Sequence, residues 1–144
     1  MRFGIVGAGM IAEFHARAIK DMAGAELAAV CARRPEAAQD FAARHACAAY
    51  TDLDEFLADG TLDIVTICTP SGAHLEPTVA AARSGTHVIC EKPLEVTSER
   101  VDRMIAACDS AGVTLAGIFP RRFNQATRLL KAAVDSGRFG RIAI

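Results

Sequence analysis

Three things are scarce or absent in this 144-residue sequence, and each excludes a class of protein. Charge of one sign does not dominate, because 16 lysine and arginine residues face 17 acidic residues, so a binder of nucleic acid or membrane surfaces is not expected. No uninterrupted apolar run approaches the roughly 20 residues that cross a bilayer. The five cysteines form no CxxC pair, so neither a metal site nor a disulfide framework is expected.

The sequence does contain enough apolar material for a core, with 51% hydrophobic and 23% charged residues. Its length predicts about one domain. The first twenty residues carry Arg2, Glu13, His15 and Arg17 and lack the order of segments that marks a secretory signal. If the cysteines serve as small apolar residues in a reducing compartment, the chain is expected to be cytoplasmic.

Short apolar runs alternate with segments of helical periodicity. We predict strands at 3–6, 27–31, 64–68, 87–90 and 113–118, with a weaker one at 47–49. We predict helices from 10 to before 24 and at 35–45, 51–58, 72–84, 98–111 and 125–136. Thr51, with Asp54 three residues later, is expected to cap the short third helix. Strands that are almost continuously apolar and alternate with helices predict a doubly wound α/β domain of the Rossmann type, with a parallel sheet.

The last eight residues, GRFGRIAI at 137–144, indicate a turn that enters a further strand. Such a strand would be an unpaired sheet edge with nothing to cover it. We therefore expect that the chain is a fragment of a longer protein, or that a partner supplies the rest.

A glycine-rich stretch, GAGMIA at 7–12, follows the first predicted strand directly and opens the first predicted helix. Gly7 permits the tight turn, Gly9 lets a pyrophosphate approach the backbone, and Ala12 keeps helix and strand close. The free N–H groups at the helix N-terminus attract the anion. In this context the GxGxxA pattern predicts a dinucleotide-binding site, the alternative being glycines that serve only the turn.

The residues after the second strand bear on the choice of dinucleotide. Sites specific for NAD usually hold the ribose 2′-hydroxyl with an acidic residue there, whereas this chain has Ala32, Arg33 and Arg34. Without the carboxylate a 2′-phosphate is not repelled, and an arginine can pair with it. We therefore favour NADP over NAD, the alternative being a solvent-exposed turn ahead of Pro35.

Lysine is rare, since only three of the 16 basic residues are lysines. One of them, Lys92, lies in the string Cys90-Glu91-Lys92-Pro93 at the end of the predicted fifth strand. Carboxyl ends of parallel strands line the ligand crevice of an open α/β sheet. A compact ammonium there suggests chemistry, the alternative being an ordinary exposed lysine at a strand end.

Four stretches together resemble one family: the glycine loop, TPSGAH at 69–74, GTHVICEKP at 85–93 and FPRRF at 119–123. They resemble the glucose–fructose oxidoreductase / inositol 2-dehydrogenase (Gfo/Idh/MocA) family over essentially the whole chain. The resemblance implies an N-terminal Rossmann domain at 1–120 and, at 121–144, the start of a C-terminal α/β substrate domain that is largely missing. It implies hydride transfer between NAD or NADP and a carbinol carbon of a sugar, polyol or related compound, with little activity from this chain alone.

The resemblance also implies a set of cofactor-binding residues: Gly7, Gly9, Met10, Ile11, Ala32, Arg33, Arg34, Cys68, Thr69, Pro70, His74, Glu91, Lys92, Arg121 and Arg122. Among them Lys92 is implied to be catalytic, because the matching lysine hydrogen-bonds the reacting oxygen and tunes proton transfer. An asparagine common after the fourth strand is replaced here by Ser71-Gly72, and a catalytic Asp and His would lie beyond Ile144.

Other interpretations stay open. One alternative is that the chain is a non-catalytic dinucleotide-binding or sensing module. Another keeps the enzyme class but changes the family. The families considered share the N-terminal fold but fit the Glu91-Lys92-Pro93 string less well: homoserine dehydrogenase, dihydrodipicolinate reductase and biliverdin reductase. His15 and His87 are expected to be structural and His45 solvated, whereas His74 fits either role. The expected partners are a nicotinamide dinucleotide and, in an intact enzyme, a sugar- or polyol-like substrate, with homo-oligomerisation left open.

Overall fold

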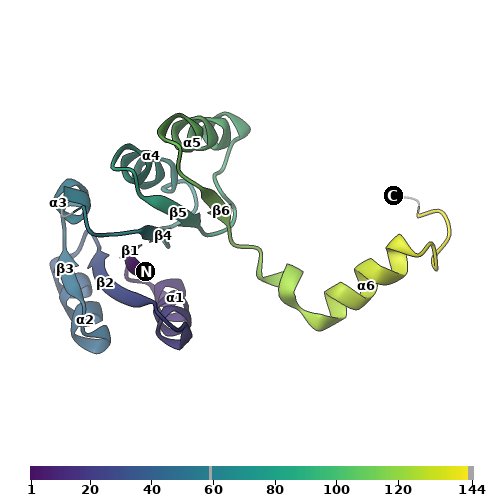
Figure 1. The fold of residues 1–144 in the computed structure, drawn as a ribbon, viewed down its shortest axis with the longest axis horizontal. Helices are drawn as coiled ribbons and strands as arrows, with labels where there is room; N and C mark the ends of the chain where they lie inside the picture. The colour runs from purple at the N-terminus through teal and green to yellow at the C-terminus, as the bar shows by residue number, and fades with distance from the viewer. Residues whose placement is uncertain (59, 143–144) are drawn as a thin grey trace.

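The computed structural model describes residues 1–58 and 60–142, and these contain a six-stranded parallel sheet (Figure 1). Its strands are β1 (Arg2–Val6), β2 (Glu26–Cys31), β3 (Ala48–Tyr50), β4 (Ile64–Ile67), β5 (His87–Cys90) and β6 (Leu115–Gly117). They lie in the order β3-β2-β1-β4-β5-β6, and every neighbouring pair is parallel. This is the strand order of a Rossmann fold, so the predicted doubly wound α/β architecture is confirmed.

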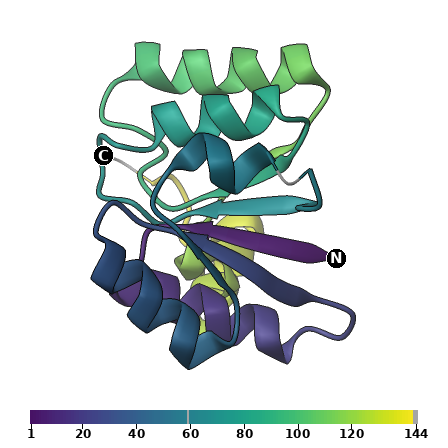
Figure 2. The same cartoon turned by 90° about the vertical axis from the view of Figure 1, so that its left-hand side faces the viewer.

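Helices cover both faces of the sheet (Figure 2). They are α1 (Met10–Asp21), α2 (Pro35–His45), α3 (Leu53–Ala58), α4 (Leu75–Arg83), α5 (Ser98–Ala111), the 3₁₀ helix η1 (Pro120–Phe123) and α6 (Gln125–Asp135). Helices α1 and α2 pack on one face, and α3, α4 and α5 pack on the other. Helix α6 extends away from the sheet, and its side chains are almost all exposed (Figure 1). None of the described helices is long and apolar enough to cross a membrane.

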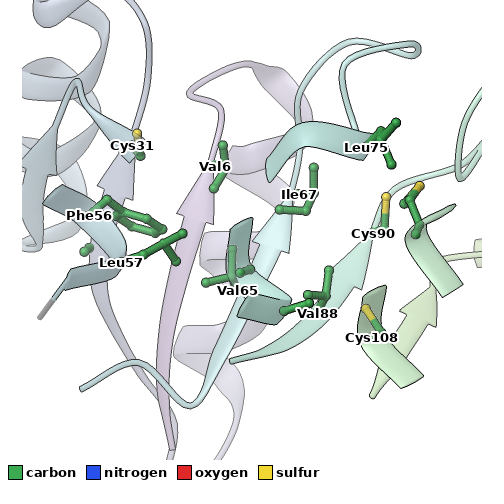
Figure 3. Packing of buried hydrophobic residues seen from close by; sticks show 14 residues of the cluster. Val6, Cys31, Phe56, Leu57, Val65, Ile67, Leu75, Val88, Cys90 and Cys108 are labelled. Atoms are coloured by element: carbon green, nitrogen blue, oxygen red, sulfur yellow. The ribbon is translucent and has the colours of Figure 1, made fainter. Parts of the chain in front are cut away.

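Two apolar clusters, one on each face, hold the layers together. In the cluster beneath α3, α4 and α5, Val65, Ile67 and Val88 of the central strands pack with Phe56 and Leu75 (Figure 3). Because β1 and β4 are buried on both faces, their sequences are almost continuously apolar rather than alternating, with Arg2 at the start of β1 and the buried Thr66 in β4 as the exceptions. This nearly continuous apolar pattern is the one from which both strands were predicted.

The cysteines belong to this apolar interior, as the sequence suggested. Four of them are buried, and all five are free thiols. Burial raises the pKa of Cys90 to about 12, so its thiol is uncharged at neutral pH and packs as a small apolar group.

Two predicted helix starts are wrong, each for a local reason. Helix α3 is capped by Asp52, whose Oδ1 accepts from the N–H of Glu55 at 2.9 Å, and not by Thr51. Helix α4 begins at Leu75 rather than at residue 72, because the Glu95 carboxylate accepts from the N–H groups of His74 and Leu75. A carboxylate at this position satisfies the free donors of the first turn, so it fixes where the helix starts.

The cap at Asp52 leads to a first prediction. Replacing Asp52 with alanine removes the acceptor for a first-turn N–H, and α3 carries the buried Phe56 and Leu57 into the core. We expect the free energy of unfolding, measured by urea denaturation, to fall by about 1 kcal/mol. Thr51→Ala is the matched control and is expected to change it by less than about 0.5 kcal/mol. A larger loss in the control would show that Thr51 caps the helix after all.

The predicted C-terminal strand falls partly outside the described residues. Residues 136–139 form the expected turn, and 140–142 are not in a strand. The remainder, 143–144, lies outside the described residues.

Candidate dinucleotide-binding site

A cavity of about 1080 Å³ opens at the carboxyl ends of β1, β2 and β4. The two halves of the sheet, β3-β2-β1 and β4-β5-β6, meet between β1 and β4, where the strand order reverses. An open α/β sheet binds its ligand at this point. The cavity is lined by Val6, Gly7, Ala8, Gly9, Met10, Ile11, Cys31, Ala32, Arg33, Arg34, Ala37, Thr51, Leu53, Cys68, Thr69, Pro70, Ala73, Glu76 and Pro77. Ten of the fifteen predicted cofactor-binding residues are among them, running from Gly7 to Pro70.

The two glycines of the loop have different reasons to be glycine. Gly7 has φ +107°, and a Cβ there would lie 2.7 Å from the carbonyl oxygen of Cys68, so the fold itself requires glycine. Gly9 precedes α1 with φ −90° and ψ −173°, an extended backbone open to any residue. A Cβ at Gly9 would meet no atom of the described residues within 4 Å. The space beside Gly9 is therefore open cavity, next to the free N–H groups of α1.

The end of β2 brings two cations to the rim of the cavity. Arg33 and Arg34 are exposed, and across the part of the chain that the structure describes neither guanidinium forms an ion pair. Ala32 lies between them and the strand and donates its N–H to Tyr50 O at 3.0 Å. Both arginines are thus free to meet an anionic ligand.

The segment after β4 forms the opposite wall. Cys68 lines the cavity there, and burial raises the pKa of its thiol to about 12, so the residue brings no charge to this wall. Thr69 Oγ1 donates to the carbonyl of Ala73 at 2.8 Å, which shapes the turn that leads into α4. Thr69 and Pro70 therefore lie in a fixed turn rather than in a loose loop.

His74, whose role the sequence left open, does not line the cavity. It is 1% exposed, and its Nδ1 lies 2.9 Å from Pro93 O and 3.1 Å from Leu94 O. Its Nε2 lies 2.9 Å from Thr69 O. The ring joins the turn after β4 to the segment after Lys92, which is a structural position.

Glu91 and Lys92 lie one strand further along the same sheet edge and outside the cavity lining. The Glu91 side chain is 11% exposed; Oε1 lies 3.2 Å from His15 Nε2 and Oε2 accepts from the N–H of Lys92 at 3.0 Å. Lys92 itself is exposed, and among the described residues its ammonium forms no ion pair.

Arg121 and Arg122 are also outside the cavity. They lie on η1, the short helical turn between the sheet and α6 (Figure 1). Both side chains are exposed. The guanidinium carbon of Arg122 lies 5.8 Å from the centre of the Phe119 ring. The structure of this chain does not bring them to the residues of the cavity.

His15, which the sequence predicted to be structural, is the α1 residue that contacts Glu91. It lies on the same face of α1 as the buried Ala12, Ala16 and Ile19. A histidine on the buried face of a helix needs a polar partner, and this was the signal in the sequence that His15 makes such a contact.

In the described part of the chain, no three His, Cys, Asp or Glu side chains come close enough to hold a metal ion.

The strand order, the glycine loop at the start of α1 and the cavity at the crossover define a dinucleotide-binding Rossmann domain. Comparison with known proteins narrows this class. The model of the GFO_IDH_MocA family, described as an oxidoreductase family with an NAD-binding Rossmann fold, matches residues 1–119. The chain belongs to this family, which confirms the resemblance seen in the sequence.

Several relatives are named as inositol dehydrogenases, and others are named as a hydratase and a reductase of anhydro sugars. Inositol 2-dehydrogenase of Rhizobium meliloti is 35% identical over 142 residues, which are 99% of this chain and 43% of the relative. The scyllo-inositol 2-dehydrogenase (NADP(+)) IolU of Bacillus subtilis is 36% identical over 116 residues, covering 80% of this chain and 35% of the relative. The WlbA dehydrogenase of Bordetella pertussis, solved in complex with NADH and UDP-GlcNAcA, is 39% identical with a TM-score of 0.94, covering 99% of this chain and 44% of that one. The chain thus spans less than half the length of these relatives.

Proposed function

We propose that this chain binds a nicotinamide dinucleotide in the cavity at the ends of β1, β2 and β4, as the cofactor-binding part of an oxidoreductase. The observation that carries the proposal is the open space beside Gly9, at the N-terminus of α1 and at the crossover of the sheet. A pyrophosphate needs close approach to such backbone N–H groups. The residues present therefore fit the cofactor that the family uses.

Each part of the dinucleotide has a counterpart in the chain. The pyrophosphate would meet Gly9 and the first turn of α1, and the adenosine ribose would lie toward Ala32 and Arg33 at the end of β2. The nicotinamide half would extend over the second half of the sheet, past Thr69 toward Lys92. The bound nicotinamide supplies hydride transfer, and the protein supplies binding and orientation.

Lys92 is the residue to which we assign a catalytic role in the intact enzyme. Its ammonium is exposed at the end of β5, beside the strand whose end forms one wall of the cavity. From there it would hydrogen-bond the oxygen of the substrate carbinol and hold or release its proton. A non-catalytic sensing module would not need this ammonium, so its position favours an enzyme.

The substrate and the second domain are also proposals. Inositol and sugar dehydrogenases among the relatives support a polyol or sugar substrate. Assigning 1–120 to the cofactor domain and 121–144 to the start of a substrate domain is supported by α6, which extends from the sheet with Leu129 and Leu130 exposed. The cytoplasmic location and the oligomeric state stay predictions.

For the cofactor itself we propose a preference for NADP. Among the described residues the guanidinium groups of Arg33 and Arg34 form no ion pair, so at the rim they would bind a 2′-phosphate, and the residue directly after β2 is Ala32 rather than a carboxylate that would repel it. Relatives of both kinds exist, because the WlbA structure contains NADH and the name of IolU specifies NADP(+).

Titration of the chain with NADPH and with NADH, followed by fluorescence or calorimetry, tests both proposals. We expect NADPH to bind more tightly, and Arg33→Ala to weaken NADPH binding by about 10-fold or more, because a charge-assisted contact of about 1.5–3 kcal/mol is lost. NADH binding should change by less than about threefold.

Arg83→Ala, an exposed arginine at the end of α4, is the matched control and should change neither affinity. Tighter binding of NADH by the unmodified chain would overturn the assignment of Arg33 and Arg34 but keep the dinucleotide site. Absence of binding by either dinucleotide would contradict the proposed function of this chain.

A further inference from the structure

A histidine and a glutamate that are distant in the sequence meet at the edge of the site. His15 lies on α1 and Glu91 follows β5, and their side chains are only 13% and 11% exposed. Nε2 of His15 lies 3.2 Å from Oε1 of Glu91. An ionised carboxylate only accepts hydrogen bonds, so Nε2 carries the proton and donates it.

The second oxygen of the same carboxylate is also occupied. Glu91 Oε2 accepts from the backbone N–H of Lys92 at 3.0 Å. The N–H of Glu91 donates in turn to Ile67 O of β4 at 3.1 Å. The carboxylate is thus held by a side chain of α1 on one side and by the backbone of Lys92 on the other.

This arrangement connects two parts of the proposed binding site. Helix α1 begins at the glycine loop, where the pyrophosphate would lie. Glu91 and Lys92 follow β5, which pairs with β4, the strand that leads into Cys68 and Thr69 of the cavity wall. Because the second half of a Rossmann sheet carries the nicotinamide half of the ligand, Glu91 lies at that end of the crevice.

We propose that His15 is a positioning residue for the nicotinamide end of the site: by donating to Glu91 it fixes the carboxylate against the N–H of Lys92 and so sets the course of the backbone that carries the lysine. The proposal rests on the proposed function, since it concerns the same cofactor. It gives α1 a second role, because the helix that would bind the pyrophosphate also orients the segment at the far end of the cofactor.

The role predicts which half of the cofactor depends on His15. Replacing it with leucine removes the donor and leaves a nearly buried carboxylate with one oxygen unpaired. We expect the carboxylate to turn toward water and to release Lys92 N–H. The adenine half should be unaffected, because the residues expected to bind it lie at the ends of β1 and β2.

The experiment measures the affinity of each variant for two ligands. The first is NADPH or NADH, whichever the unmodified chain binds more tightly. The second is the adenine half of that dinucleotide, which is 2′-phosphoadenosine 5′-diphosphate for NADPH and ADP for NADH. In His15→Leu the dinucleotide should bind about tenfold more weakly, and the adenine nucleotide should change by less than about twofold. In His15→Gln the amide N–H replaces the donor and should restore dinucleotide affinity to within about threefold. Equal weakening of both ligands, no weakening of either, or failure of His15→Gln to restore binding would overturn the proposal.

His45→Leu is the matched control, because His45 forms the other histidine–glutamate contact to α1, with Nε2 2.8 Å from Glu13 Oε2. It loosens α1 without touching Glu91, so dinucleotide affinity should stay within about twofold. A loss equal to that of His15→Leu would overturn the proposal.

A second readout needs no ligand and separates this proposal from the proposed function. Amide hydrogen exchange followed by NMR should show faster exchange at Lys92 N–H in His15→Leu than in the unmodified chain and in His15→Gln. Unchanged exchange at Lys92 would overturn the role of His15 even if the dinucleotide binds. Faster exchange in a chain that binds no dinucleotide would support the contact between His15 and Glu91, and would contradict only the proposal that the chain binds a nicotinamide dinucleotide.

Discussion

Gly9→Val is expected to weaken dinucleotide binding on the order of 100-fold or more, because at least two charge-assisted contacts to the pyrophosphate would be lost, each worth about 1.5–3 kcal/mol. The valine side chain would occupy the open space beside the N-terminus of α1, which the phosphate needs. The backbone at Gly9 is extended, so valine is tolerated there without strain. Titration with NADPH and NADH and urea unfolding of the same variant measure the two effects separately.

Gly7→Ala is the contrasting variant for this prediction. Its φ of +107° and the carbonyl oxygen of Cys68, 2.7 Å from the added Cβ, make the substitution strained in the folded state. We expect a loss of about 1–3 kcal/mol in the free energy of unfolding. For Gly9→Val, which places an unfavourable residue at the N-cap of α1 but introduces no positive φ and no clash, the loss should be smaller, about 0.5–1 kcal/mol. If Gly9→Val kept its affinity, the phosphate would not lie at the glycine loop.

The architecture was predictable because its signals are local and repeated. Strands such as β4 and β5 are short apolar runs bounded by turn residues, and helices such as α5 end at a glycine, Gly112, whose φ is +67°. Once the strands are known to be parallel, their carboxyl ends meet at one edge. The cavity then follows from the position of the glycine loop after β1. This is why the predicted residues of the loop, of the end of β2 and of the segment after β4 lie together.

The parts that were not predictable depend on contacts between distant residues. His15 and Glu91 are 76 positions apart, and nothing in the local pattern of α1 indicates which strand end its histidine meets. The start of α4 is set by Glu95, 20 positions away from Leu75. At α3, Thr51 and Asp52 are both good capping residues, so the local sequence does not decide between them.

Glu95 is the residue for which we expect the largest effect on stability. Its side chain is fully buried; Oε1 accepts from His74 N, Leu75 N and the Arg100 guanidinium, and Oε2 accepts from Val96 N at 2.8 Å. Burial by itself would raise the pKa of this carboxyl, but the hydrogen bonds from Arg100 and the backbone outweigh it and lower the pKa from 4.5 to about 2. Glu95→Gln leaves an amide NH₂ facing these donors and should cost about 2–3 kcal/mol at pH 7.

The pH dependence follows from the direction of that shift. Because the pKa of Glu95 is lower in the folded chain than in the unfolded chain, its contribution to stability is fully present above pH 4.5 and declines as the pH falls toward 2. Urea unfolding at pH 7 and at pH 3 should therefore show a smaller difference between Glu95→Gln and the unmodified chain at the lower pH. Glu76→Gln removes an exposed carboxylate that pairs with the same Arg100, and should cost less than about 1 kcal/mol at either pH. Equal losses in the two variants would mean that the ion pair with Arg100, rather than the carboxylate's bonds to α4 and Val96, holds the segment that follows Lys92.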